Sequence, residues 1–161
     1  MAVPFTVRKA EVPDIEVLVS MRVELLHVAA ALGMPTDLGE EEWSEVGAAV
    51  RTYFAEAIPS GKYCGVMAEA GGKVIACGGI TFMQRPPYQR HLEGSEAYLM
   101  NMFTLPEWRG KGAGTAIVAE LLKLAKEAGV KRVWLDAEEK ARPLYAKAGF
   151  HANVEAMEIL I

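Results

Sequence analysis

The 161 residues are enough for one domain with a sizeable core and too few for two. Hydrophobic residues make up 52% and charged residues 24%, an ordinary globular composition. No apolar run reaches the ~18 residues of a membrane span, no signal-peptide core begins the chain, and no basic-aromatic interleaving indicates nucleic-acid binding. We therefore expect a single domain over residues 1–161, cytoplasmic, with neither a membrane nor a nucleic acid as partner.

Charge is unevenly distributed along the chain. Residues 1–108 carry 8 basic and 14 acidic residues, a net charge of −6, whereas residues 109–147 carry 9 and 5, a net charge of +4. A basic stretch suits a polyanionic cofactor, and an acidic one suits a cationic substrate. Cys64 and Cys77 lack CxxC spacing, so we expect neither a metal site nor a disulfide.

The first half of the chain mixes helical and strand patterns, punctuated by proline and glycine. Gly71-Gly72 is a hairpin signal, and proline with acidic residues suits a first helical turn. The expected elements are a strand over 5–9, a helix from Val12-Pro13-Asp14 to Gly33, a loop over 34–39, a helix from Glu40 to just before Pro59, strands over 62–70 and 73–84, and a loop over 85–94 in which His91 is a surface residue.

Arg22 is the unusual residue of the first helix. At about 100° per residue it falls in the middle of the apolar stripe, opposite Glu16, Ser20, Glu24 and His27. An unpaired buried charge is very costly, so the guanidinium must meet carboxylate or carbonyl groups. We favour an internal partner or a side chain that extends to solvent; contact with a substrate is the alternative.

The second half is organised around a strand, a glycine-rich turn and a helix. A strand over 97–105 runs into Pro106, and Arg109-Gly110-Lys111-Gly112-Ala113-Gly114 precedes a helix that Gly129 ends. Glycines let consecutive N–H groups face inward, and the first helical turn has donors without internal partners. This turn is therefore expected to bind a phosphate or pyrophosphate. Beyond it we expect a short buried strand over 131–137, a helix that becomes regular near Arg142, and a last strand from Phe150 to Ile161.

Spacing separates this turn from two other phosphate motifs. A P-loop needs a glycine where the chain has Leu105, and the dinucleotide fingerprint needs one at Thr115 or Ile117. What remains, Arg-x-x-Gly-x-Gly between a strand and a helix, resembles the acetyl-CoA signature of the GNAT N-acetyltransferases. The segment from Arg142 to Phe150 likewise resembles the family's ending, Leu-Tyr-x-x-x-Gly-Phe, and element order agrees over essentially the whole chain.

The resemblance implies an α/β fold: a mixed, twisted sheet flanked by about four helices, whose fourth and fifth strands splay apart around CoA. It implies Tyr145 as the general acid. Glu138 stands where many members have an asparagine that contacts CoA, so that contact is not carried over. The residues that the resemblance assigns to acetyl-CoA are Met102, Phe103, Thr104, Arg109, Gly110, Lys111, Gly112, Ala113, Gly114 and Thr115.

The resemblance does not identify the general base. Glu24, Glu96, Asn101 and Asp136 are candidates, and a water chain is another. Arg22 and Asn101 are the residues we associate with the acceptor.

The function that the resemblance implies is direct acetyl transfer from acetyl-CoA to a small-molecule amine, without a metal. A protein N-terminus or lysine as acceptor is the alternative within the enzyme class. A non-catalytic acyl-CoA-binding sensor is the alternative outside it. A homodimer is left open.

Overall fold

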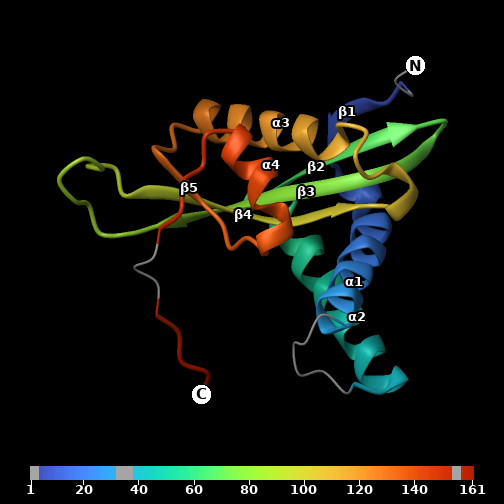
Figure 1. Cartoon of the computed structure of the whole chain (residues 1–161). Coiled ribbons are helices and arrows are strands. Elements are labelled where there is room, and N and C mark those ends of the chain that lie inside the picture. Colours follow the sequence, from blue (N-terminus) through green and yellow to red (C-terminus); the bar gives the residue numbers. More distant parts are fainter. Residues whose placement is uncertain (1–3, 32–37, 154–156) are drawn as a thin grey trace.

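The computed structural model describes residues 4–31, 38–153 and 157–161 (Figure 1). One five-stranded sheet has the order β1-β2-β3-β4-β5, antiparallel throughout except for the parallel pair β4–β5. The expected helix end at Gly33 lies outside the described residues. The strands and helices are β1 (Thr6–Lys9), α1 (Ile15–Ala31), α2 (Glu40–Ala57), β2 (Tyr63–Ala70), β3 (Lys73–Gln84), β4 (Ser95–Thr104), α3 (Ala113–Glu127), β5 (Arg132–Trp134) and α4 (Arg142–Lys147).

Helices cover both faces of the sheet. Helices α3 and α4 lie on one face, and α1 and α2 lie on the other (Figure 1). On the first face, Ile117 and Leu121 of α3 pack with Val66 and Ile80 of the sheet. On the second, Leu18 of α1 and Phe54 of α2 pack with Tyr63 and Met67. Neighbouring strand residues such as Val66 and Met67 alternate between the two cores, as the two-residue period of a strand requires.

The β2–β3 hairpin forms as its glycines predict. Ala70 pairs with Lys73, so Gly71 and Gly72 alone make the turn. Both have positive φ, +58° and +77°, the combination that a type I′ turn needs and that only glycine adopts readily.

Strand β4 contains a bulge at its centre. Cys77 of β3 faces Phe103, but Gly79 faces Met100, so Gly78 faces two residues, Asn101 and Met102. Asn101 has φ +58°, the only positive value outside glycine in the described chain. Such a bulge bends its strand and increases the local twist. Accordingly β4 pairs with β5 only from Glu96 to Tyr98, and the remainder of β4 diverges from β5.

Two expectations about the C-terminal part were wrong. The last strand, expected from Phe150 to Ile161, is not a strand at any described residue, and Met157 to Ile161 are exposed. Strand β5 is shorter than the expected 131–137 and half-buried rather than buried, because its pairing with β4 stops at Trp134. Among the helices described, none is both long and apolar enough to span a bilayer.

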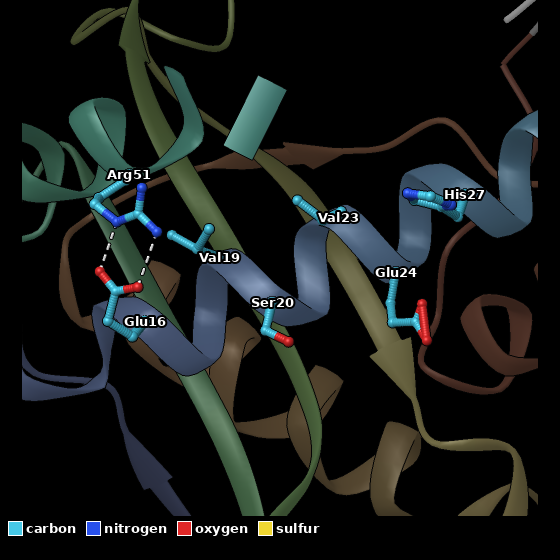
Figure 2. A pocket seen from close by; sticks show the side chains of 7 residues that line it. All are labelled: Glu16, Val19, Ser20, Val23, Glu24, His27 and Arg51. Carbon is cyan, nitrogen blue, oxygen red and sulfur yellow. Dashed lines mark hydrogen bonds and ion pairs between the residues drawn. The ribbon is translucent and has the colours of Figure 1, made fainter. Parts of the chain in front are cut away.

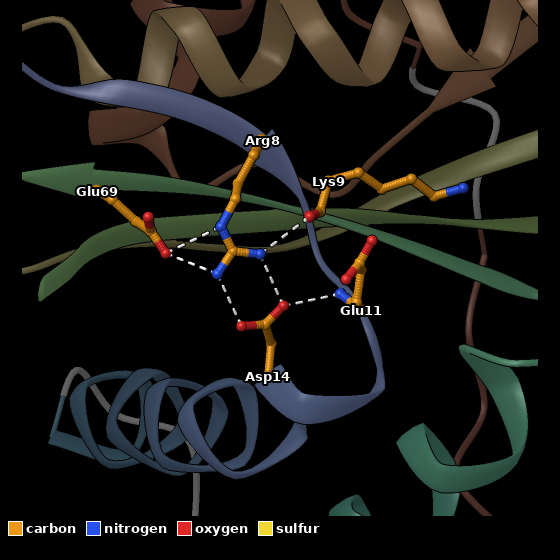
Figure 3. A network of polar contacts seen from close by, with 5 residues as sticks. All are labelled: Arg8, Lys9, Glu11, Asp14 and Glu69. Atoms are coloured by element: carbon orange, nitrogen blue, oxygen red, sulfur yellow. Dashed lines mark hydrogen bonds and ion pairs between the residues drawn. The ribbon is translucent and has the colours of Figure 1, made fainter. Parts of the chain in front are cut away.

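Arg8 joins the first strand to the start of α1 (Figure 3). Its guanidinium donates to both carboxylate oxygens of Asp14 at 2.8 Å and to Glu69 of β2 at 2.6 and 3.0 Å. Asp14 also accepts the backbone N–H of Glu11 at 2.8 Å. The hydrogen bonds from Arg8 lower the pKa of Asp14.

We predict that Asp14→Asn destabilises the fold at pH 7 by about 1–3 kcal/mol, the typical value of hydrogen bonds to charged groups. The native pKa lies below the unfolded value of about 3.9. The stabilisation is therefore complete above that value and is lost as pH falls through the native pKa. Urea unfolding of both proteins at pH 7, 5 and 3 measures this.

The matched control is Glu45→Gln, which removes an exposed carboxylate of α2. It is expected to stay within about 0.5 kcal/mol of wild type at each pH. The role of this ion pair is contradicted if Asp14→Asn is as stable as wild type at pH 7. It is also contradicted if the loss of unfolding free energy is as large at pH 3 as at pH 7.

Candidate functional site

The turn between β4 and α3 presents backbone donors to solvent. Gly110 and Gly112 have φ of +72° and +89°, and Gly112 is the N-cap of α3. The first helical hydrogen bond runs from Ala116 N to Gly112 O at 3.0 Å, so the N–H groups of residues 113–115 have no helical partner. A Cβ added at Gly110 or Gly112 would meet nothing within 4 Å. The turn is thus an open cradle suited to an anion. The helix begins at Ala113, two residues earlier than expected, so Gly114 lies in its first turn.

The two basic side chains of the cradle are exposed and only lightly held. Arg109 Nε donates to the carbonyl of Thr104 at 3.1 Å, which closes the turn against the end of β4. Lys111 Nζ lies 5.0 Å from the centre of the Trp108 ring, a cation–π contact. Both charges therefore remain available beside the orphan N–H groups of α3.

The β5-facing edge of β4 leads into this cradle. Beyond Tyr98, β4 has no strand partner on that side within the described part of the chain. This stretch includes Met102, Phe103 and Thr104, of which Phe103 is buried against the α1–α2 face and the other two are half-buried. An unpaired strand edge offers backbone N–H and C=O groups to an extended ligand.

Tyr145 lies on α4, on the α3 side of the sheet. Its ring is 7% exposed and meets Phe150 edge-on with centroids 5.9 Å apart. Its hydroxyl has no hydrogen-bond partner among the described residues. Burial, and then the nearby charge of Glu138, raise the pKa of Tyr145, so the phenol keeps its proton at neutral pH. Glu138 itself is exposed.

The opposite face of β4 carries a second polar group at the bulge. Asn101 is 7% exposed; its Nδ2 donates to the Tyr63 hydroxyl at 3.2 Å, while its Oδ1 is buried without a partner. The Tyr63 ring lies against Gly79, where any side chain would collide with it. Burial raises the pKa of Tyr63 above its ordinary range and that of the neighbouring Cys77 to about 12. Neither group ionises near neutral pH.

Arg22 is half-buried on α1, and of the two alternatives that we favoured, the internal partner is not found among the described residues. It forms no hydrogen bond or ion pair with any described residue. Its charge is nevertheless close enough to lower the pKa values of Tyr63, Cys77 and Tyr98, opposing the effect of burial on each. Leu18 and Leu25, one helical turn before and after Arg22, pack into the core that includes Tyr63 and Cys77, so Arg22 lies on the face of α1 that meets the sheet.

The carboxylates considered as bases are mostly engaged elsewhere. Glu96 is 1% exposed and paired with Arg132 at 3.0 Å and with Arg85 at 3.5 Å. Asp136 accepts the hydroxyl of Tyr98 at 2.9 Å, and burial together with this bond raises the pKa of Tyr98 to about 12. Of these two, only Asp136 is exposed to solvent.

Glu24 lies in an open groove along α1, away from the cradle (Figure 2). Arg51 of α2 borders the groove and binds Glu16 at 2.6 and 3.0 Å, while Ser20 and Glu24 point away from α2. His27 stacks on Trp43 with centroids 3.8 Å apart. This groove includes neither Arg22 nor Asn101, so Glu24 is poorly placed to act with them.

The 85–94 loop also differs from expectation. His91 is buried rather than on the surface, because its backbone exchanges two hydrogen bonds with Tyr88 and folds the loop on itself. The Tyr88 hydroxyl reaches Glu96 at 3.1 Å. The loop projects from the end of the sheet away from α1 and α2 (Figure 1).

Sequence reasoning did not single out Tyr63, which binds Asn101, or Tyr98, which binds Asp136. Each stands in an ordinary strand pattern. Their importance arises from the bulge at Asn101, and no local sequence signal identified it.

Comparisons with known proteins agree with this arrangement. Residues 30–150 match the acetyltransferase (GNAT) family. The structure superposes with a TM-score of 0.84 on a predicted acetyltransferase from Clostridium acetobutylicum crystallised with acetyl-CoA, at 29% identity over 98% of this chain and 96% of that one. A GCN5-related N-acetyltransferase from Ralstonia eutropha JMP134 gives a TM-score of 0.82 over 98% and 99% of the two chains; at 22% identity this likeness concerns the fold alone.

Curated relatives match over shorter stretches. The chain is 30% identical over 90 residues to a glucosamine 6-phosphate N-acetyltransferase of Trypanosoma brucei brucei, covering 55% of this chain and 58% of that protein. It is 41% identical over 58 residues to a [ribosomal protein bS18]-alanine N-acetyltransferase of Haemophilus influenzae, covering 35% and 40%. The matched parts thus span about half of these proteins. The family match over residues 30–150, together with the α/β fold and its splayed fourth and fifth strands, shows that the chain belongs to the GNAT acetyltransferase family.

Proposed function

We propose that the protein is an N-acetyltransferase that moves the acetyl group of acetyl-CoA directly to the amine of a small molecule. One observation carries this proposal: the unpaired edge of β4 leads straight into the open cradle at the start of α3. An extended pantetheine can pair with a strand edge, and a pyrophosphate suits orphan N–H groups at a helix N-terminus. The acetyl-CoA in the Clostridium acetobutylicum relative supports this use of the fold.

The residues of the cradle fit this co-substrate. Gly110 and Gly112 leave room for a phosphate to approach the backbone, and Arg109 and Lys111 supply positive charge at the same place. Met102, Phe103 and Thr104 would hold the extended arm through their backbone groups. Acetyl-CoA itself supplies an acyl group on a thiolate leaving group.

The transfer requires little covalent chemistry from the protein. The neutral amine attacks the thioester carbonyl; a C–N bond forms, the C–S bond breaks, and the nitrogen loses a proton while the sulfur gains one. Tyr145 is proposed to supply the proton to sulfur, since its hydroxyl keeps its proton at neutral pH and forms no hydrogen bond with a described residue. Asp136 or water would take the proton from nitrogen. A sensor that only binds acyl-CoA does not require a general acid, so a protonated tyrosine at this position favours the enzyme.

The acceptor is proposed to be a small amine because the face of β4 opposite α3 presents two buried polar groups, Asn101 and Tyr63, which suit a compact polar ligand. One relative acetylates glucosamine 6-phosphate, and another acetylates an alanine of ribosomal protein bS18. Release of CoA with a panel of amino acids, amino sugars, polyamines and peptides tests the proposal. Acetyl-CoA binding without CoA release for any amine would favour the sensor.

The cradle predicts the effect of Gly112→Asp on acetyl-CoA binding. An aspartate at the N-cap accepts the N–H groups of the first turn itself and repels phosphate. Loss of charge-assisted hydrogen bonds is expected to raise Kd roughly 10- to 100-fold. Titration calorimetry measures this, with circular dichroism as the test of folding.

Gly129→Asp is the matched control. Gly129 also has positive φ, +77°, and open space around it, but it lies at the other end of α3. This variant incurs similar backbone strain and should keep wild-type affinity. Equal affinities for a folded Gly112→Asp protein and wild type would remove the cradle from the binding site.

The role of Tyr145 predicts the behaviour of Tyr145→Phe. The ring and its contact with Phe150 remain, so Kd for acetyl-CoA should not change, while kcat should fall about 10²- to 10⁴-fold. Single-turnover kinetics at saturating acetyl-CoA isolates the chemical step. A decrease smaller than twofold would mean that the tyrosine only packs.

The pKa of Tyr145 also predicts the pH profile of kcat. The phenol must be protonated to act, and burial raises its pKa above the ordinary value of about 10. Loss of activity on the alkaline side through this group should therefore begin only above about pH 10. An alkaline limb centred near pH 8 that disappears in Tyr145→Phe would contradict the assignment.

A further inference from the structure

Arg22 is an unpaired cation at a half-buried position. The other arginines at the sheet have carboxylate partners: Arg8 binds Asp14 and Glu69, and Arg132 binds Glu96. Arg22 has no such partner among the described residues, although burial of a guanidinium without one is costly. A position of this kind is stable in the free protein only because water reaches the charge, and it gains from an incoming anion.

The surroundings of Arg22 define where that anion would lie. Leu18 and Leu25, one helical turn to either side of Arg22, pack with Tyr63 of β2 and Cys77 of β3, and the charge of Arg22 lowers the pKa values of both groups. The same residues surround Asn101: Tyr63 accepts its amide N–H at 3.2 Å, and the Cys77 thiol contacts its carbonyl at 3.5 Å. Arg22 and Asn101 therefore face one surface, on the α1 side of the β4 bulge.

Asn101 supplies a second, independent indication of a ligand. Its Oδ1 is buried and has no partner among the described residues, and an orphan acceptor of this kind normally costs stability. Its backbone is held at φ +58°, and the bulge turns its side chain to the face opposite Leu99. An amine brought to the β4–β5 gap would offer N–H groups to this oxygen.

The overall negative charge of residues 1–108 does not describe this surface. Among the acids of this segment, Asp14 and Glu69 pair with Arg8. Glu96 pairs with Arg85 and Arg132. The charged groups that act on Tyr63, Cys77 and Tyr98 are Arg22 and, for Tyr98 alone, Asp136. The charge of Arg22 on the sheet-facing side of α1 argues against a purely cationic acceptor.

We propose that the acceptor is an anionic amine, in which Arg22 binds a carboxylate or phosphate and Asn101 Oδ1 accepts a hydrogen bond from the amine that is acetylated. This rests on the proposed function for the identity of the reaction and adds the class of substrate. Two classes of small amine carry such an oxyanion: amino acids, through their carboxylate, and amino-sugar phosphates, through their phosphate.

The test compares acceptors that differ only in the anion: alanine with alaninamide, and glucosamine 6-phosphate with glucosamine. Initial rates of CoA release give kcat/KM for each. The amine of alaninamide is less basic than that of alanine, so a larger fraction of alaninamide carries the neutral, reactive amine. A preference for alanine would therefore arise in spite of this difference and not because of it. The wild-type enzyme should prefer the anionic member of at least one pair roughly 10- to 100-fold, mainly through KM. The preferred pair identifies the source.

Arg22→Met should reduce this preference to near one without lowering Tm, because no internal partner is left behind. Arg51→Met is the matched control: it removes an exposed arginine of α2 that pairs with Glu16, and it should keep the preference. Asn101→Gly relieves the positive φ and should lower kcat/KM for both members of a pair equally. Equal wild-type use of both members, or an undiminished preference in Arg22→Met, overturns the proposal.

Binding separates this proposal from the proposed function. Calorimetric titration of each compound into the CoA-saturated protein measures the anion preference without turnover. If no amine is acetylated but the anionic members still bind through Arg22, the enzyme assignment fails and the ligand class stands. If acetylation occurs without an anion preference, the enzyme assignment stands and the proposed ligand class fails.

Discussion

The structure depends on one residue inserted in β4. Because Asn101 and Met102 together face Gly78, the strand bends where its neighbour β5 would otherwise continue beside it. A side chain at Gly78 would come within 2.7 Å of Ile117, so the bulge and the α3 face fit only around a glycine there. The bend exposes a strand edge and, at the same time, turns Asn101 toward the opposite face. The proposed binding edge for acetyl-CoA and the proposed acceptor surface thus arise from a single irregularity.

Side chains hold the two edges of the gap in place. The β4–β5 pairing involves only residues Glu96–Tyr98 and Arg132–Trp134, which is short for a parallel ladder. Glu96 binds Arg132 at 3.0 Å, and Tyr98 binds Asp136 at 2.9 Å and contacts the Trp134 ring, with centroids 4.5 Å apart. Since Asp136 follows the end of β5, these contacts fix the strand beyond its backbone pairing.

The parts of the site that were predictable from sequence are those whose chemistry is local. The Gly110–Gly114 turn is recognisable because helix entry, positive φ and orphan donors all belong to neighbouring residues. Arg22 was identified as anomalous from helical periodicity, but its surroundings depend on how α1 packs on the sheet, and the internal partner is not found among the described residues. His91 and the expected last strand failed for the same reason: burial and strand pairing depend on which distant segments are available. The apolar residues Ile159 to Ile161 favour a strand locally, yet β5 offers an edge of only three residues.

The central claim is that acetyl-CoA lies along the unpaired edge of β4 with its pyrophosphate at the start of α3. Hydrogen–deuterium exchange, followed by mass spectrometry with and without saturating acetyl-CoA, tests it most directly. Slower exchange is predicted for peptides within residues 102–116, with no change in 63–70, since β2 is paired on both sides. Unchanged exchange in 102–116 at saturation, or protection confined to the groove along α1, would contradict the account.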